Sequence, residues 1–202
     1  YDLDGREMER LLEHGDDDFS FSVSGVGRFR CNAYKQRNSL AMVLRIVTLS
    51  LPNPETMHIP KEVLDLSSVK KGLVLVTGPA ASGKSTTLAC VIDRINTSRH
   101  GHIITIEDPI EFIHPHKQSV VSQREIEHDT DSYKSALRAA LRQAPDVIMI
   151  GEMRDFETIQ TALTAAETGQ LVLSTLHTVG AAKTIDRIID VFPANQQQQI
   201  RV

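Results

Sequence analysis

The sequence of 202 residues contains only two cysteines, Cys31 and Cys90, and they stand far apart in the chain. Two isolated cysteines exclude a disulfide framework and a four-cysteine zinc site, so the composition suits a reducing compartment. Cys90 lies within an apolar helical pattern, where a free and buried thiol is expected.

Long apolar runs and an excess of positive charge are also missing. No run approaches the roughly 18 residues that a membrane-spanning helix needs, so the sequence predicts no transmembrane segment. The formal net charge of −4 disfavours a dedicated nucleic-acid-binding protein, although a local basic patch is compatible with it. With 41% hydrophobic residues the chain can still bury a core, which excludes a disordered protein.

The first 50 residues predict a small α+β domain, 1–50, in which two strands form a hairpin. Pro52 and Pro54 interrupt this pattern and begin a predicted linker, 51–70, with a short helix near 60–68. The elements expected in the first domain are a helix at 1–13, a solvated acidic turn at 15–18, and strands at 19–23, 28–34 and 41–47.

From Lys71 onward, strands alternate with helices, which predicts an α/β domain over 71–202 with a mostly parallel sheet. The chain does not begin with methionine and stops in a helix-like segment, so we expect a fragment of a longer protein, incomplete at its C-terminal end. The expected strands are 73–77, 103–107, 146–150 and 171–175, and the expected helices lie near 84–97, 131–143 and 155–168.

Residues 78–85 match the P-loop pattern G-x-x-x-x-G-K-[ST]. The predicted strand before the loop and helix after it suit a backbone that points N–H groups at a phosphate, and they disfavour a chance glycine-rich turn. Lys84 is expected to reach the β- and γ-phosphates of ATP, and the Ser85 hydroxyl to ligate Mg²⁺. The predicted nucleotide contacts in this segment are Gly78, Pro79, Ala80, Ala81, Ser82, Gly83, Lys84, Ser85 and Thr86.

Polar residues stand at the ends of the other predicted strands. A P-loop ATPase needs a carboxylate there to hold Mg²⁺ or polarise the attacking water. Glu152 follows an apolar strand in Walker-B-like form, and Glu107 is a second candidate. Either carboxylate can instead cap a helix or form a surface ion pair, but several polar strand ends together favour a site. His177 can sense the γ-phosphate, bridge two carboxylates, or simply be hydrogen-bonded at a strand end.

ATP hydrolysis also needs a cationic group over the transferred phosphate. Arg28, Arg30 and Arg45, on predicted strands of the first domain, can reach a nucleotide at a domain or subunit interface, although any one of them also suits a solvated β-surface. The remaining histidines lack metal-ligand spacing, so we expect surface loop positions for His100, His102, His114 and His116.

Four segments resemble, in order, the P-loop, the Asp box, Walker B and the His box of secretion-type (GspE-like) ATPases: 78–85, 104–111, 151–155 and 173–178. Within that superfamily the chain is most similar to the PilT family of type IV pilus retraction ATPases, which 27–34, 122–125 and 181–187 also resemble. The resemblance covers nearly the whole chain. It implies a PAS-like N-terminal domain followed by a RecA-like ATPase domain, with ATP and Mg²⁺ as cofactors and the nucleotide between the two domains.

The resemblance further implies a hexameric motor that powers pilus retraction and twitching motility. Such a homo-hexamer lies in the cytoplasm, peripherally associated with the inner membrane through the platform protein of the pilus machine, and needs no nucleic acid. The resemblance leaves open which of the two glutamates activates water. The site residues that it implies are Lys84, Glu107, Glu152 and His177 for catalysis, Ser85 and Glu152 for Mg²⁺, and Arg30 and Arg45 for the nucleotide.

Two positions depart from the family pattern. Ala80-Ala81 replaces the usual Thr-Gly, and alanine resists the positive φ that glycine tolerates at position 81. Gln170 stands where a second histidine is common, so no role of that histidine is carried over. The alternatives are a pilus-extension or type II secretion assembly ATPase, a non-catalytic nucleotide binder, and a nucleic-acid translocase. The first of these typically carries a four-cysteine zinc module after the His box; the two isolated cysteines argue against it, but the incomplete C-terminal end keeps it open.

Overall fold

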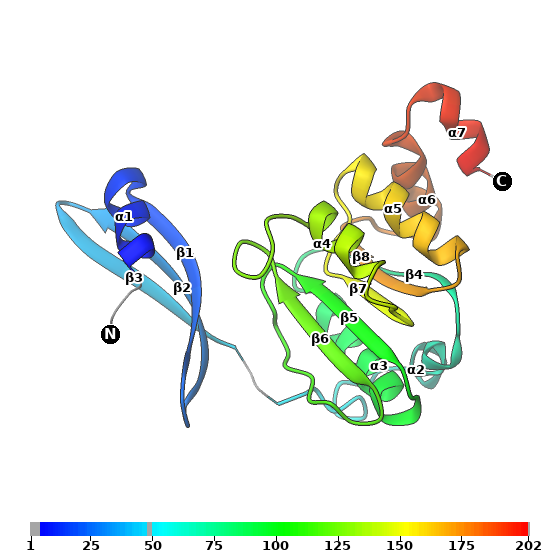
Figure 1. Cartoon of the computed structure of the whole chain (residues 1–202), viewed down its shortest axis with the longest axis horizontal. Coiled ribbons are helices and arrows are strands. Elements are labelled where there is room, and N and C mark those ends of the chain that lie inside the picture. Colours follow the sequence, from blue (N-terminus) through cyan, green and yellow to red (C-terminus); the bar gives the residue numbers. More distant parts are fainter. Residues whose placement is uncertain (1–4, 48–49, 202) are drawn as a thin grey trace. The chain divides into compact units, whose positions relative to one another are not determined.

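The computed structural model describes residues 5–47 and 50–201, and the chain divides into two compact units between Ser50 and Leu51 (Figure 1). The first unit has one helix and an antiparallel sheet in the order β1-β2-β3. Its small core contains Leu11, Phe19 and Cys31. Its elements are α1 (Gly5–His14), β1 (Asp16–Val23), β2 (Gly27–Gln36) and β3 (Ser39–Val47).

The predicted hairpin is confirmed, because β1 and β2 pair with Phe19 opposite Cys31. The predicted acidic turn is wrong, because β1 already begins at Asp16. Asp17 is buried, and its carboxylate lies 3.3 Å from Nε of Arg10 on α1. This ion pair offsets part of the cost of burying the charge, which the acidic composition alone did not reveal. The first four residues of the predicted helix 1–13 lie outside the described residues.

The second unit is built on a five-stranded sheet in the order β4-β8-β7-β5-β6, in which all pairs are parallel. The α/β fold class is therefore confirmed. The strands are β4 (Gly72–Thr77), β5 (His102–Glu107), β6 (Val120–Glu125), β7 (Val147–Ile150) and β8 (Leu171–Leu176).

Helices cover the sheet, so its apolar strands are buried on both faces. One core cluster joins α3 to the sheet through Leu88, Ile92 and Ile95, and the other joins α4 and α5 to the opposite face through Leu137 and Ile159. The helices are α2 (Lys61–Asp65), η1 (a 3₁₀ turn, Leu66–Ser68), α3 (Lys84–Ser98), α4 (Tyr133–Ala140), α5 (Phe156–Glu167), α6 (Ala181–Asp190) and α7 (Ala194–Ile200).

Two parts of this unit were not foreseen. The sequence did not predict β6, because only Val120 and Val121 are apolar and a polar segment follows them in this edge strand. Residues 51–70, expected to be a linker, belong to the second unit, where α2 and η1 pack against α3. In the described part of the chain, no helix is long and apolar enough to cross a membrane.

Candidate functional site

The register of the sheet gathers polar residues at one edge. Ile106, Ile150 and Ser174 form one row across β5, β7 and β8. The residues that follow this row therefore leave the sheet at the same edge, where parallel α/β folds place their ligands. Glu107 follows the row directly, and Glu152 comes one residue after Gly151. β4 ends at the same edge of the sheet, next to β8, and continues into the P-loop.

The P-loop backbone enters the left-handed region at three positions, with φ of +156° at Gly78, +59° at Ala81 and +90° at Gly83. The two glycines adopt it freely, whereas a residue with a Cβ pays about 1–2 kcal/mol for it. Ala81 thus takes the conformation that the sequence marked as unfavourable for alanine. The Gly78 amide donates to the Leu176 carbonyl at 3.2 Å, which ties the loop to β8.

Lys84, the first residue of α3, folds back over its own loop. Its Nζ donates to the carbonyls of Pro79 at 2.8 Å and Gly78 at 3.1 Å. These bonds hold the ammonium group at the mouth of the loop. In P-loop proteins, this is the end at which the lysine contacts phosphates.

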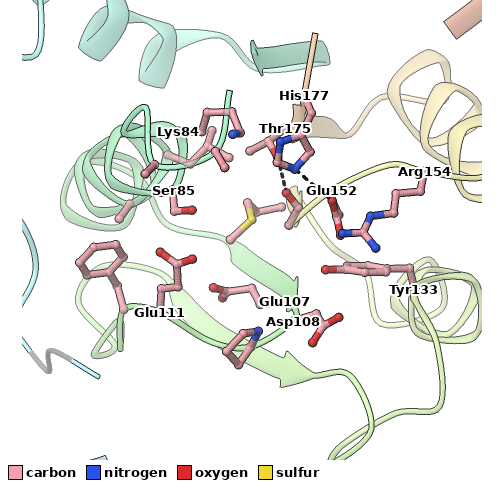
Figure 2. Close-up of a pocket in the computed structure, with 18 of the residues that line it drawn as sticks. Lys84, Ser85, Glu107, Asp108, Glu111, Tyr133, Glu152, Arg154, Thr175 and His177 are labelled. Atoms are coloured by element: carbon pink, nitrogen blue, oxygen red, sulfur yellow. Dashed lines mark hydrogen bonds and ion pairs between the residues drawn. The ribbon is translucent and has the colours of Figure 1, made fainter. Parts of the chain in front are cut away.

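One cavity of about 290 Å³ is lined by seven of the predicted site residues (Figure 2). Ala80, Ala81, Lys84 and Ser85 line it from the P-loop side. The opposite wall carries the predicted catalytic groups Glu107, Glu152 and His177. The other contacts predicted in the P-loop segment do not line the cavity, but they belong to the same loop or to the first turn of α3: Gly78, Pro79, Ser82, Gly83 and Thr86.

Glu107 is the buried carboxylate of this wall, with 8% of its surface exposed. Its Oε1 accepts hydrogen bonds from Thr105 Oγ1 at 2.6 Å and from Gln123 Nε2 at 3.1 Å. Burial nevertheless dominates and raises the pKa of Glu107 to about 7. A carboxyl group with such a pKa exchanges a proton readily near neutral pH.

Glu152 contacts the side chains of Arg154 and His177. Its Oε1 is 2.5 Å from Nη2 of Arg154, and its Oε2 is 3.4 Å from Nε2 of His177. The two partners are 75% and 54% exposed, so both can move away, while Glu152 itself is mostly buried. Among the residues that the structure describes, His177 thus contacts one carboxylate rather than bridging two.

Arg30 and Arg45 lie opposite each other on β2 and β3 of the first unit. Nothing in the second unit's cavity tests their predicted contact with the nucleotide, so that role stays a prediction. Arg28 lies two residues before Arg30 on the same strand.

Sequence reasoning missed the roles of two residues at the site. Arg154 was part of the Walker B segment but received no role, and an arginine two residues after a carboxylate was the available signal. Tyr133 carried no signal at all, because only the tertiary structure brings the start of α4 to this cavity.

The surface-loop prediction for the histidines is wrong at two positions. His114 is 6% exposed, and burial lowers its pKa to about 4. His102 lies on β5, where its Nε2 is 2.9 Å from Ser122 Oγ.

Within the ranges 5–47 and 50–201, no group of three or more His, Cys, Asp or Glu side chains is arranged to hold a metal ion.

The chain matches a known protein family and several known proteins. The family model described as "Type II/IV secretion system protein" matches residues 32–200. The type IV pilus retractation ATPase PilT of Pseudomonas aeruginosa is 51% identical over 200 residues, which are 99% of this chain and 57% of that protein. A twitching motility protein of Neisseria gonorrhoeae is 52% identical over 184 residues, 91% of this chain and 49% of that protein.

Among solved structures, the pilus retraction motor PilT with bound ADP superposes with a TM-score of 0.95 at 55% identity. The match covers 98% of this chain and 58% of that one. The chain therefore spans about half to three fifths of the length of these similar proteins.

Proposed function

The chain belongs to the type II/IV secretion system protein family, and within it to the PilT-type secretion ATPases, and we propose that its second unit binds MgATP and hydrolyses the bond between the β- and γ-phosphates. One observation carries this proposal. A single cavity joins the P-loop residues Lys84 and Ser85 to the carboxylates Glu107 and Glu152.

In this proposal Lys84 leaves the carbonyls of its loop and contacts the phosphates, whose charge competes for the ammonium group. Ser85 and Glu152 offer hydroxyl and carboxylate oxygens, the donors that Mg²⁺ prefers, so the residues present fit this ion. When bound, Mg²⁺ neutralises the negative charge that develops on the phosphate oxygens.

Glu107 is the better candidate for the general base. Its raised pKa of about 7 lets it accept a proton from water and release it again near neutral pH. Glu152 instead contacts Arg154 and His177 and is assigned to Mg²⁺. These assignments divide the two roles that the sequence left open.

Beyond the chemistry, we propose that the whole protein is a homo-hexameric motor for pilus retraction and twitching motility. The names of the similar proteins, a pilus retraction ATPase and a twitching motility protein, support this function. In this proposal Arg30 and Arg45 approach the nucleotide, and the ring works in the cytoplasm on the inner-membrane platform protein. The competing function is pilus extension or type II secretion.

Phosphate release by the full-length protein tests the proposed chemistry. We expect the Lys84→Ala variant to lose turnover and to bind ATP more weakly. Lys61→Ala, which removes an exposed lysine at the start of α2, is the matched control and should leave both unchanged. Normal hydrolysis by Lys84→Ala would overturn the assignment.

A deletion strain distinguishes the two directions of pilus movement. Excess surface pili without twitching support retraction. A strain without pili indicates an extension or assembly motor instead.

A further inference from the structure

Tyr133 places a phenol hydroxyl among the carboxylates of the site (Figure 2). It is the first residue of α4 and lines the 290 Å³ cavity. It also lines a neighbouring cavity of about 570 Å³, and Asp108, Glu152 and Arg154 line both as well. Tyr133 therefore belongs to the wall that the two cavities share, at the carboxylate end of the site.

The position of this side chain is well determined by its surroundings. Ser132 caps α4 by accepting a hydrogen bond from the Ser135 amide at 3.2 Å, and the Tyr133 ring packs against the buried core. A Cβ on Gly151 would lie 2.9 Å from the hydroxyl oxygen and 3.4 Å from the Ile106 carbonyl oxygen. A Cβ at residue 151 would therefore force the Tyr133 hydroxyl to shift from this position.

The Tyr133 hydroxyl is a hydrogen-bond donor. Burial, followed by the charges of Asp108, Glu152 and Glu107, raises the pKa of Tyr133 well above its usual range. The phenol consequently stays protonated and cannot act as a base. Among the described residues, no hydrogen bond uses this hydroxyl, although carboxylates surround it.

A molecule between this donor and the carboxylates must accept one hydrogen bond and donate others. Water does both, whereas a phosphate oxygen only accepts and would be repelled by the carboxylates. We infer that the Tyr133 hydroxyl donates a hydrogen bond to the water that attacks the terminal phosphate, and so orients it. This inference rests on the proposed hydrolysis of ATP.

The step balances without any further reactant. The water oxygen forms a bond to the γ-phosphorus, and the bond from that phosphorus to the β–γ bridging oxygen breaks with its electron pair on ADP. The water proton passes to Glu107, while Tyr133 keeps its own proton. One lone pair of the water accepts the hydrogen bond from Tyr133, and one water proton points at Glu107. The other lone pair, which attacks the phosphorus, then has fewer orientations to sample, and this lowers the entropic part of the barrier.

The Tyr133→Phe variant of the full-length protein tests this inference, because phenylalanine keeps the ring packing and removes only the hydroxyl. We expect kcat for phosphate release to fall roughly tenfold to a hundredfold. The KM for ATP, the affinity for ADP and the Tm should stay near their wild-type values. Tyr34→Phe, on β2 of the first unit, is the matched control and should not change kcat.

Three outcomes would contradict the inference. A wild-type kcat in Tyr133→Phe shows that the hydroxyl does not touch the reacting water. A raised KM with unchanged kcat shows that it contacts the nucleotide instead. A weaker affinity for ADP together with a lower Tm in Tyr133→Phe shows that the hydroxyl has a structural role. If the wild-type protein releases no phosphate while it binds ATP, the proposed function itself fails, and this result is distinct from all three.

Discussion

Oε1 of Glu152 lies 2.5 Å from Nη2 of Arg154, two residues further along the chain. The pair occupies a carboxylate oxygen that the proposed Mg²⁺ site needs. Arg154 is 75% exposed, so its side chain can swing into solvent when a divalent cation competes for Glu152. The arginine and the ion are therefore expected to bind this carboxylate in competition.

Removing this competitor should make Mg²⁺ more effective. We predict that Arg154→Gln lowers the Mg²⁺ concentration for half-maximal turnover about two- to fivefold, the range expected for loss of an exposed ion pair. A titration of Mg²⁺ at saturating ATP measures this half-maximal concentration. Arg94→Gln, which removes an exposed arginine on α3, is the control. An unchanged or higher Mg²⁺ requirement in Arg154→Gln argues against the competition.

The pKa of Glu107 predicts how turnover depends on pH. A general base must be ionised, and burial holds the pKa of Glu107 at about 7. We expect kcat/KM for phosphate release to fall tenfold per pH unit below about pH 7 and to level off above it. Measurement between about pH 5.5 and 8.5 covers this limb. A profile that stays flat down to pH 5.5 would exclude Glu107 as the base.

The same group predicts a pH-dependent change in stability. The carboxyl pKa is about 7 in the folded state against an ordinary value of 4.5, so the folded state holds the proton more tightly. As pH rises from 4.5 to 7, ionisation destabilises the fold, and the cost is complete above that window. Glu107→Gln removes this cost, which amounts to at most roughly 3 kcal/mol.

Thermal unfolding at two pH values measures this effect. Glu107→Gln should melt above wild type at pH 8, and the difference should shrink at pH 5, where wild-type Glu107 is already protonated. Glu62→Gln, on the exposed surface of α2, should show no such trend. A Tm difference that is the same at both pH values contradicts the prediction.

The left-handed backbone at Ala81, with φ of +59°, predicts a stabilising substitution. Ala81→Gly relieves the Cβ strain, and after the greater flexibility of glycine in the unfolded chain is subtracted, we expect a gain of up to about 1 kcal/mol. Urea unfolding measures it. Ala80→Gly is the control in the same loop, because Ala80 does not have a positive φ and should gain nothing. Equal effects of the two substitutions would rule out the strain.

The paired arginines of the first unit provide a further prediction. Arg30 and Arg45 are opposite each other on β2 and β3, so one phosphate group can contact both. We expect Ala substitution at each position to weaken ATP binding or to lower kcat in the full-length protein, since each removes a positive charge that the proposed function assigns to the phosphates. Nucleotide affinity and turnover that stay at wild-type values in both variants would remove these residues from the site.

Much of the second unit could be predicted because its signals are local. A buried parallel strand is an apolar run, and a P-loop is eight consecutive residues, so both are visible without any knowledge of the fold. The edge strand β6 could not be predicted in the same way, because it pairs on one side only and most of its residues are polar. The acidic turn at 15–18 was predicted wrongly for a related reason. The arginine that pairs with the buried Asp17 comes from a separate element, α1.

The sequence by itself determined the phosphate-binding loop, the α/β class and the identity of Glu107, Glu152 and His177 as candidates, because each depends on neighbours in the chain. The tertiary structure alone decided how these groups differ. The sheet register brings Glu107 and Glu152 to one cavity, burial raises the pKa of Glu107 to about 7, and Glu152 pairs with Arg154. Both residues are glutamates, so residue type cannot distinguish them. Their positions in the fold do, because position sets the dielectric surroundings and the charge partners of a carboxylate.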